Sequence, residues 1–397
     1  MDAAPAVSDL DGRAPVLAAA GQDGAGAVVR LAQELIRIDT TNPPGAELPA
    51  AQHMAEYLEA AGLEIELQPF DGCRANLVAR VRGSGERPGL LFSGHLDTVP
   101  VGEETRWTVA PRGGLVKDGR LFGRGSLDMK GSVAAMTVAV AGLGRSRRVP
   151  KGDIVVALTA GEETDSCGAR MICDAGLLEG VGMAVIGEPT GLDVGIGHRG
   201  ALWVRADAHG AAAHGSQPDA GLNAVRELLA WLHPFATLEA LIAEPEDALL
   251  GAGSVSLNII GGGTSANVVP DRAHAVLDFR TVPGQPHREL LRALERRGAG
   301  VMMTVLRDSP PIATPKDAPL VQAVVSAVTD VTGRHDIRGL PYMTDASIFV
   351  EALGIPAVVV GPGPEAHAHT EDESVEVAAL EHALRIYTSV AEKLMYE

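Results

Sequence analysis

The stretch Gly94-His95-Leu96-Asp97-Thr98-Val99-Pro100 decides how the rest of this chain is organised. It follows residues 89–93, an apolar run that predicts a buried strand. Side chains two positions apart in an extended segment point the same way, so His95 and Asp97 leave the end of that strand together. A carboxylate in this position is typical of a metal-binding imidazole whose second ring nitrogen needs a partner. A strand cap with a surface ion pair would look the same, so the choice depends on the other acidic clusters of the chain.

The composition is that of a large globular protein. The chain has 397 residues, of which 46% are hydrophobic, and this is enough for two domains with a sizeable core. The formal net charge of −18 argues against a nucleic-acid partner, because phosphate contacts need clustered Lys and Arg. The three cysteines have no paired spacing, which indicates a reducing, cytoplasmic environment. We also expect no membrane partner, since no apolar run approaches the roughly 20 residues of a transmembrane helix.

Two patterns of predicted elements divide the chain. Near-continuous apolar strands alternate with helices over residues 27–198 and again over 310–397, which predicts an α/β sheet covered by helices on both faces. Between them, residues 199–309 show the order strand, helix, strand, strand, helix, strand, which is the ferredoxin-like split βαββαβ arrangement. We therefore expect a main domain in two segments with a smaller domain inserted in it. Residues 1–26 lack clear periodicity and are expected to form a mobile extension.

Potential metal ligands stand where several of the predicted strands end. In open α/β sheets, ligands bind outside the carboxyl ends of the strands, so side chains from these places can meet. Two histidines and three carboxylates could hold two divalent ions if one carboxylate bridges them and a water lies between them. The candidate residues are His95, Asp128, the adjacent Glu162 and Glu163, Glu188 and His369.

The adjacent Glu162 and Glu163 need a specific explanation. Two carboxylates side by side at a buried strand end repel each other, so one should take up a proton unless a cation is near. A metal bound by one of them and a water held by the other resolves the conflict, and the second carboxylate can then act as a general base. A solvated acidic turn would explain this pair alone. The joint occurrence of several ligand types after apolar strands favours the metal site.

Five segments taken together resemble the M20 metallopeptidases, a family that includes acetylornithine deacetylase, succinyl-diaminopimelate desuccinylase, aminoacylase-1 and the glutamate carboxypeptidases. The resemblance covers about residues 28–395, in the order of the family. It implies a zinc-dependent, exopeptidase-like catalytic domain, a mixed sheet flanked by helices, with residues 199–309 as a lid and dimerisation domain. The segments are Gly94-His95-Leu96-Asp97-Thr98-Val99-Pro100, Gly123-Arg124-Gly125-Ser126-Leu127-Asp128-Met129-Lys130-Gly131, Gly161-Glu162-Glu163, Gly187-Glu188-Pro189-Thr190 and Ala368-His369-Thr370-Glu371-Asp372-Glu373.

The resemblance implies two zinc ions in each subunit, and cobalt or manganese would suit the same ligands. His95 and Glu188 would bind one ion, and Glu163 and His369 would bind the other. Asp128 would bridge the two ions. The family pattern also implies a cis peptide bond directly after Asp128.

Two residues beside the ligands are implied to act in the reaction. Glu162 would be the general base on a water that bridges the metals, and Asp97 would support the imidazole of His95. His367 competes with His369 as a ligand, since the two share a face of an extended segment. The family spacing favours His369.

The inserted domain carries a second set of implied site residues. His214 would reach the site of a partner subunit and stabilise the oxyanion, which implies a homodimer. The usual family pattern is His-Ser-Ser, and here Gly215 replaces the first serine. Asn267 and Arg280 match family positions that hold a substrate carboxylate, a task for which an arginine fork is suited. A surface histidine and an ordinary exposed arginine are the alternatives for His214 and Arg280 taken alone.

Together these residues predict a dinuclear metal-dependent amidohydrolase that acts on an N-acyl amino acid or a similar small amide with a free carboxylate, in the manner of a deacetylase or desuccinylase. The nearest alternative is a carboxypeptidase or dipeptidase of the same family, which would use the same metals. A non-catalytic binding protein on this scaffold would be expected to lack ligands, and here all of them are present. The sequence leaves the acyl group and the amine open.

Overall fold

The computed structural model describes residues 24–298 and 300–397, which cluster into two compact units. Residues 1–23 of the expected extension lie outside the described residues, and Gly24 already begins the first helix. The described part of unit 1 runs to Val194 and also includes Asp317–Asp336 and Val358–Glu397, whereas unit 2 consists of Gly195–Lys316 and Ile337–Ala357.

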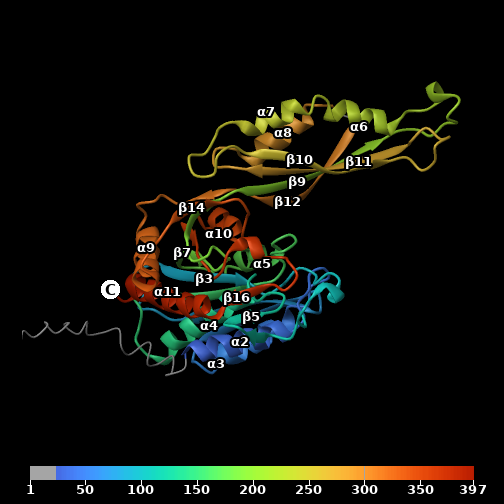
Figure 1. Cartoon of the computed structure of the whole chain (residues 1–397). Coiled ribbons are helices and arrows are strands. Elements are labelled where there is room, and N and C mark those ends of the chain that lie inside the picture. The colour runs from blue at the N-terminus through green and yellow to red at the C-terminus, as the bar shows by residue number, and fades with distance from the viewer. Residues whose placement is uncertain (1–23, 299) are drawn as a thin grey trace, which may run out of the picture. The chain divides into compact units, whose positions relative to one another are not determined.

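A mixed sheet forms the core of unit 1 (Figure 1). Along this sheet the strands of unit 1 follow one another as β1 (Glu64–Phe70), β2 (Arg74–Val81), β6 (Ile154–Thr159), β3 (Gly89–His95), β7 (Val181–Ile186) and β15 (Ala357–Val359). β3 runs parallel to both of its neighbours, whereas β2 runs antiparallel to β6 and to β1. Every residue of β3 and β6 is buried, as expected for apolar strands that are covered on both faces.

The helices of unit 1 are α2 (Gly24–Arg37), α3 (Leu48–Glu59), α4 (Lys130–Arg145), α5 (Cys167–Asp174), α9 (Pro319–Thr332) and α11 (Val377–Met395). α4 contacts the sheet and also α2 and α11, so its residues 130–143 are all buried. A helix that is apolar all round is suited to such a place. Lys130 at its start donates from Nζ to the carbonyl oxygens of Leu35 and Ile38, where the end of α2 favours a positive charge. Within the described residues, no helix is long and apolar enough to cross a membrane.

Unit 2 contains the split βαββαβ order that the sequence predicts for residues 199–309. Its elements are β9 (Gly200–His209), α6 (Ala224–Leu232), α7 (Ala236–Ala243), β10 (Ser254–Gly262), β11 (Arg272–Thr281), α8 (His287–Glu295) and β12 (Val301–Ser309). The strands form an antiparallel sheet in the order β10-β11-β9-β12, and apolar residues of its strands pack against α6, α7 and α8. α7 was not predicted. The further elements are β8 (Val194–His198), β13 (Ile312–Ala313), β14 (Ile337–Leu340) and α10 (Ala346–Leu353), with β13 and β14 paired to β8.

A small second sheet in unit 1 was not expected from the sequence. It consists of β4 (Leu115–Lys117), β5 (Arg120–Phe122) and β16 (Ser374–Glu376), in the order β16-β5-β4. Strands of three residues are too short to show a hydrophobic period, so the sequence does not predict them. The sheet matters because β16 ties the chain that follows His369 to the chain that precedes Asp128.

The close approach of two chain segments at Gly361 gives a test of the fold. A Cβ at this position would lie 2.1 Å from the carbonyl oxygen of Gly187 and 2.5 Å from that of Glu188. We expect Gly361→Ala to lower the free energy of unfolding by about 2–3 kcal/mol, because backbone atoms cannot rotate away as a side chain can. Urea unfolding measures the change. Gly300→Ala is the control, since its nearest neighbour would be 3.9 Å away, and it should stay within about 0.5 kcal/mol of the wild type. A wild-type midpoint for Gly361→Ala would contradict this packing.

Candidate metal centre

The parallel strands of unit 1 bring the candidate ligands to one edge of the sheet. β3 lies between β6 and β7 and runs in the same direction as both, so the carboxyl ends of all three strands open on the same side. β3 ends at His95, Glu162 and Glu163 follow the end of β6, and Glu188 follows the end of β7. The alternation of strands and helices therefore explains how residues far apart in the chain meet here.

Two groups of side chains lie close enough to hold a metal ion each. One group is His95, Asp128 and Glu188, and the other is Asp128, Glu163 and His369. Within each group the ligand atoms lie within 4.8 Å of one another. These five are the residues for which the family resemblance implies metal binding, and the structure brings all of them together.

Asp128 belongs to both groups and faces a different histidine with each of its oxygens. Its Oδ1 lies 3.1 Å from Nε2 of His95, and its Oδ2 lies 3.2 Å from Nε2 of His369. Glu188 completes the first group at 3.5 Å from His95, and Glu163 completes the second at 3.2 Å from His369. This is the arrangement that a carboxylate bridging two ions requires. The peptide bond after Asp128 is cis, as the resemblance implies.

The pKa values of the crowded acids and histidines indicate whether these residues fit divalent cations. Burial raises the pKa of Glu188 well above its usual range, and the charge of Asp128 raises it further. Burial and the charge of Asp128 also raise the pKa of Glu163. The hydrogen bond with Asp128, followed by that with Glu163, raises the pKa of His369 to about 10. Carboxylates and imidazoles in such a cluster form a nitrogen and oxygen donor set, which suits two divalent ions that would offset the repulsion.

Asp97 supports the centre in a way that the sequence could not specify. The Nδ1 atom of His95 bonds to the backbone carbonyl of Asp97 at 2.9 Å, whereas the carboxylate of Asp97 lies 3.6 Å away. That carboxylate instead accepts hydrogen bonds from the backbone N–H groups of Gly161, Glu162 and Glu163, at 3.0 to 3.2 Å. Asp97 therefore holds the turn that presents both glutamates.

Asn42 is a neighbour of the centre that the sequence analysis missed. Its Nδ2 donates to Oδ2 of Asp97 at 2.9 Å and to Oγ1 of Thr164 at 3.0 Å, and its side chain is buried. The sequence showed Asn42 only as part of a helix-breaking Thr-Asn-Pro-Pro-Gly turn. A polar residue that is buried has to find a partner, but no local spacing links residue 42 to residue 97.

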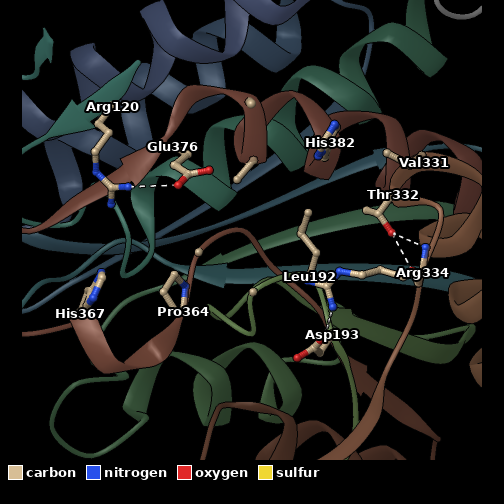
Figure 2. Close-up of a pocket in the computed structure, with 14 residues that line it drawn as sticks. Arg120, Leu192, Asp193, Val331, Thr332, Arg334, Pro364, His367, Glu376 and His382 are labelled. Carbon is tan, nitrogen blue, oxygen red and sulfur yellow. Dashed lines mark hydrogen bonds and ion pairs between the residues drawn. The ribbon is translucent and has the colours of Figure 1, made fainter. Parts of the chain in front are cut away.

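The structure separates the two histidines of the last loop. His369 belongs to the second ligand group, whereas His367 belongs to neither. His367 instead lines a cavity of about 420 Å³ together with Arg120, Arg334 and His382 (Figure 2). Glu162 also lies outside both ligand groups, and it is buried beside Glu163.

Three predicted site residues lie in unit 2. His214 is exposed, and its Nδ1 pairs with Oγ of Ser216 at 2.7 Å. The N–H of Gly215 donates to the carbonyl oxygen of Asn267 at 2.7 Å, so His214 and Asn267 are neighbours. A Cβ at Gly215 would lie 3.0 Å from the backbone of Asn267, so the two segments approach each other closely at this position. Arg280 lies on β11, where Asp278 holds its guanidinium through Nε and Nη2.

A mixed α/β sheet that gathers two histidines and three acids in overlapping groups at its strand ends defines a protein of the metal-dependent hydrolase class. Residues 91–393 match the model of the family described as Peptidase family M20/M25/M40. The chain therefore belongs to this family.

Named relatives and solved structures agree with this membership. A Staphylococcus epidermidis protein named "Probable succinyl-diaminopimelate desuccinylase" is 32% identical over 382 residues, which cover 87% of this chain and 92% of that protein. An M20 family metallo-carboxypeptidase from Sulfolobus solfataricus aligns with a TM-score of 0.77 at 19% identity, over 92% of this chain and 98% of that one. A dinuclear metal binding peptidase of the M20 family from Bacillus subtilis aligns with a TM-score of 0.69 at 17% identity, over 93% and 98%. At these identities the two structures show the fold alone.

The raised pKa of His369 predicts a pH dependence of stability in chelator-treated protein. A histidine whose pKa rises from its usual 6.5 to about 10 in the folded state stabilises it fully below pH 6.5, and the contribution is lost as the pH rises toward 10. The side chain is 48% exposed, so we expect no more than about 1 kcal/mol. Urea unfolding of wild type and His369→Gln should show their difference shrinking from pH 6 to pH 10. A difference that stays constant over this range would contradict the pairing with Asp128 and Glu163.

Proposed function

We propose that this protein is a dinuclear amidohydrolase that cuts the amide bond of an N-acyl amino acid or a similar small amide with a free carboxylate. The proposal rests on one observation: Oδ1 of Asp128 faces His95, whereas Oδ2 faces His369. Family membership supports amide hydrolysis, and the name of the Staphylococcus epidermidis relative supports a desuccinylase-like choice of substrate.

Two zinc ions are proposed as the resident metals, and the same ligands would also suit cobalt or manganese. His95, Asp128 and Glu188 would hold the first ion, and Asp128, Glu163 and His369 would hold the second. When bound, such a pair supplies Lewis acidity for the amide carbonyl and lowers the pKa of water.

Glu162 is proposed as the general base. It adjoins the ligand Glu163, is buried, and stands outside both ligand groups, so its carboxylate is not required for metal binding. Glu162 would take a proton from the attacking water and pass it to the leaving amine. Asp97 contributes by holding the backbone of the 161–163 turn, which keeps the two glutamates in fixed places.

Arg280 and Asn267 are proposed to bind the carboxylate of the substrate. Asp278 pairs with Nε and Nη2 of Arg280, so the guanidinium is already oriented before the substrate binds. Nη1 would then donate to the carboxylate of the substrate. Asn267 lies beside His214, which is proposed to stabilise the oxyanion. Unit 2 would then act as a lid that closes on the substrate.

We further propose a homodimer in which His214 serves the site of the partner subunit. β10 is an edge strand of the four-stranded sheet of unit 2, and its Ile259 and Ile260 are each 52% exposed. An apolar strand at a sheet edge favours pairing with another chain. A reducing, cytoplasmic location is also proposed, supported by the small number of cysteines and by a spacing that gives no disulfide framework.

A carboxypeptidase or dipeptidase is the second candidate function. It would use the same ligands and base, and the Sulfolobus solfataricus structure that shares the fold is described as a metallo-carboxypeptidase. The two candidates differ in the group on the carbonyl side of the cleaved bond, which is a simple acyl group in one case and an aminoacyl group in the other.

The function is tested by metal analysis and a substrate screen on protein purified without chelator. We expect about two zinc equivalents per chain and release of free amine from N-succinyl or N-acetyl amino acids. Glu162→Gln should keep both metals and lower kcat by about 10²–10⁴-fold, because only the base is lost. Cleavage of dipeptides alone would move the assignment to a peptidase. Full activity of Glu162→Gln would remove Glu162 from the mechanism, and absence of both metal and turnover would overturn the proposal.

The role of His214 in the partner's site is tested by mixing two inactive variants. We expect His214→Ala to lower kcat by about 10²–10³-fold through loss of the oxyanion donor. After unfolding and refolding with Glu162→Gln, about half of the dimers are mixed and carry one complete site, so about a quarter of wild-type activity should return. Each variant refolded alone is the control. Activity no higher than the sum of the two controls would place His214 in its own subunit's site.

A further inference from the structure

Arg124 and Glu373 form a buried ion pair in unit 1 that belongs to neither ligand group. Arg124 is 5% exposed and Glu373 is 1% exposed, and Nη1 of the arginine lies 2.6 Å from Oε2 of the glutamate. Taking two charges out of water is costly, and a buried ion pair often adds little net stability. The pair therefore calls for a role beyond holding the fold together.

Glu373 binds the turn that carries Asp128. Its Oε1 accepts the backbone N–H groups of Leu127 at 2.9 Å and Asp128 at 3.1 Å. Its backbone carbonyl accepts from the N–H of Gly123 at 2.9 Å and from Oγ of Ser126 at 3.2 Å. One residue thus makes four hydrogen bonds to the segment 123–128, in addition to its pairing with Arg124.

Arg124 is itself held from several sides. Its guanidinium lies over the ring of Trp107, with 5.2 Å from Cζ to the ring centroid, and its Nη2 lies 3.4 Å from the carbonyl oxygen of Pro100. Its backbone N–H donates to the carbonyl oxygen of Pro111 at 2.7 Å. Arg124 therefore links Oε2 of Glu373 to Pro100, Trp107 and Pro111, none of which is a candidate metal ligand.

Glu373 follows His369 by four positions in the chain, and its side chain accepts a hydrogen bond from the backbone N–H of Asp128. The two residues that it links, His369 and Asp128, lie 3.2 Å apart in the second ligand group. We propose that Arg124 and Glu373 are a positioning pair that sets the separation of Asp128 and His369 and so determines the affinity of the second metal site. This inference rests on the proposed dinuclear function.

The expected size of the effect follows from known behaviour of groups that orient metal ligands. Loss of such partners typically weakens metal binding or activity by about 10–100-fold. The first ligand group contains Asp128 but not His369, so the binding of its ion should suffer less. Selective weakening of one of two ions is a result that general destabilisation of the fold does not produce.

The test compares two double variants: one removes the buried Arg124–Glu373 pair, and the other removes a partly buried ion pair elsewhere in unit 1. Arg124→Met with Glu373→Leu removes the positioning pair without leaving one charge unpaired. Arg80→Met with Asp153→Leu is the matched control, because Asp153 also pairs with an arginine, at 2.7 Å, and accepts a backbone N–H, from Gly83. Asp153 directly precedes β6, at the opposite end of that strand from Glu162.

Equilibrium dialysis against limiting zinc, with metal analysis, gives the equivalents bound per chain without any assay of activity. We expect the wild type and the Arg80/Asp153 control to bind two equivalents, and the Arg124/Glu373 variant to bind the second at least 10-fold more weakly. Circular dichroism checks that each variant is folded. Two equivalents at wild-type affinity in the folded Arg124/Glu373 variant would overturn the inference, and so would equal weakening in the control.

Glu373→Asp keeps the test decisive if the double variant does not fold. This variant keeps the negative charge beside Arg124, but its shorter side chain draws the acceptor oxygens back from the N–H groups of Leu127 and Asp128. It should therefore also weaken the binding of the second ion at least 10-fold. Wild-type affinity in Glu373→Asp would then overturn the inference. A wild type that itself binds fewer than two equivalents would instead refute the proposed dinuclear function, so the two failures are distinguishable.

Discussion

The position of the Asp128 carboxylate is the constraint on which the rest of this site depends. Its oxygens lie 3.1 and 3.2 Å from the Nε2 atoms of His95 and His369, which belong to different ligand groups. One short side chain thus joins two clusters into a single centre. Because a bridging group has to satisfy two partners at once, a small displacement of its backbone affects both, and the turn that carries Asp128 has to be held firmly.

The protein holds its ligand-bearing turns with buried acids that bind backbone N–H groups. Asp97 accepts three N–H groups of the 161–163 turn, and Glu373 accepts those of Leu127 and Asp128. Buried N–H groups without a partner cost free energy, so each acid satisfies a turn while it fixes the ligand on that turn. As a result, several carboxylates surround the centre. Their negative charge attracts cations, and it repels an anion unless a metal ion is bound there.

Much of the fold could be predicted from the sequence because its signals are local. Apolar runs marked the strands β3, β6 and β7, and the change to a βαββαβ order marked the inserted region. Short elements escaped prediction for the same reason. The three-residue strands of the β16-β5-β4 sheet show no period, and α7 is a largely apolar segment of eight residues, too short for its periodicity to distinguish a helix from a strand.

The sequence by itself determined which kinds of side chain follow the apolar strands, and hence the chemistry that is available at the sheet edge. It also indicated, through the motif order, that His95, Asp128 and His369 belong to one site. Only the tertiary structure decided which atoms meet: the backbone carbonyl of Asp97 bonds to the imidazole of His95 while its carboxylate holds the 161–163 turn, and Glu373 accepts the backbone N–H of Asp128. These contacts join segments far apart in the chain, and their geometry follows from packing, which no local spacing encodes.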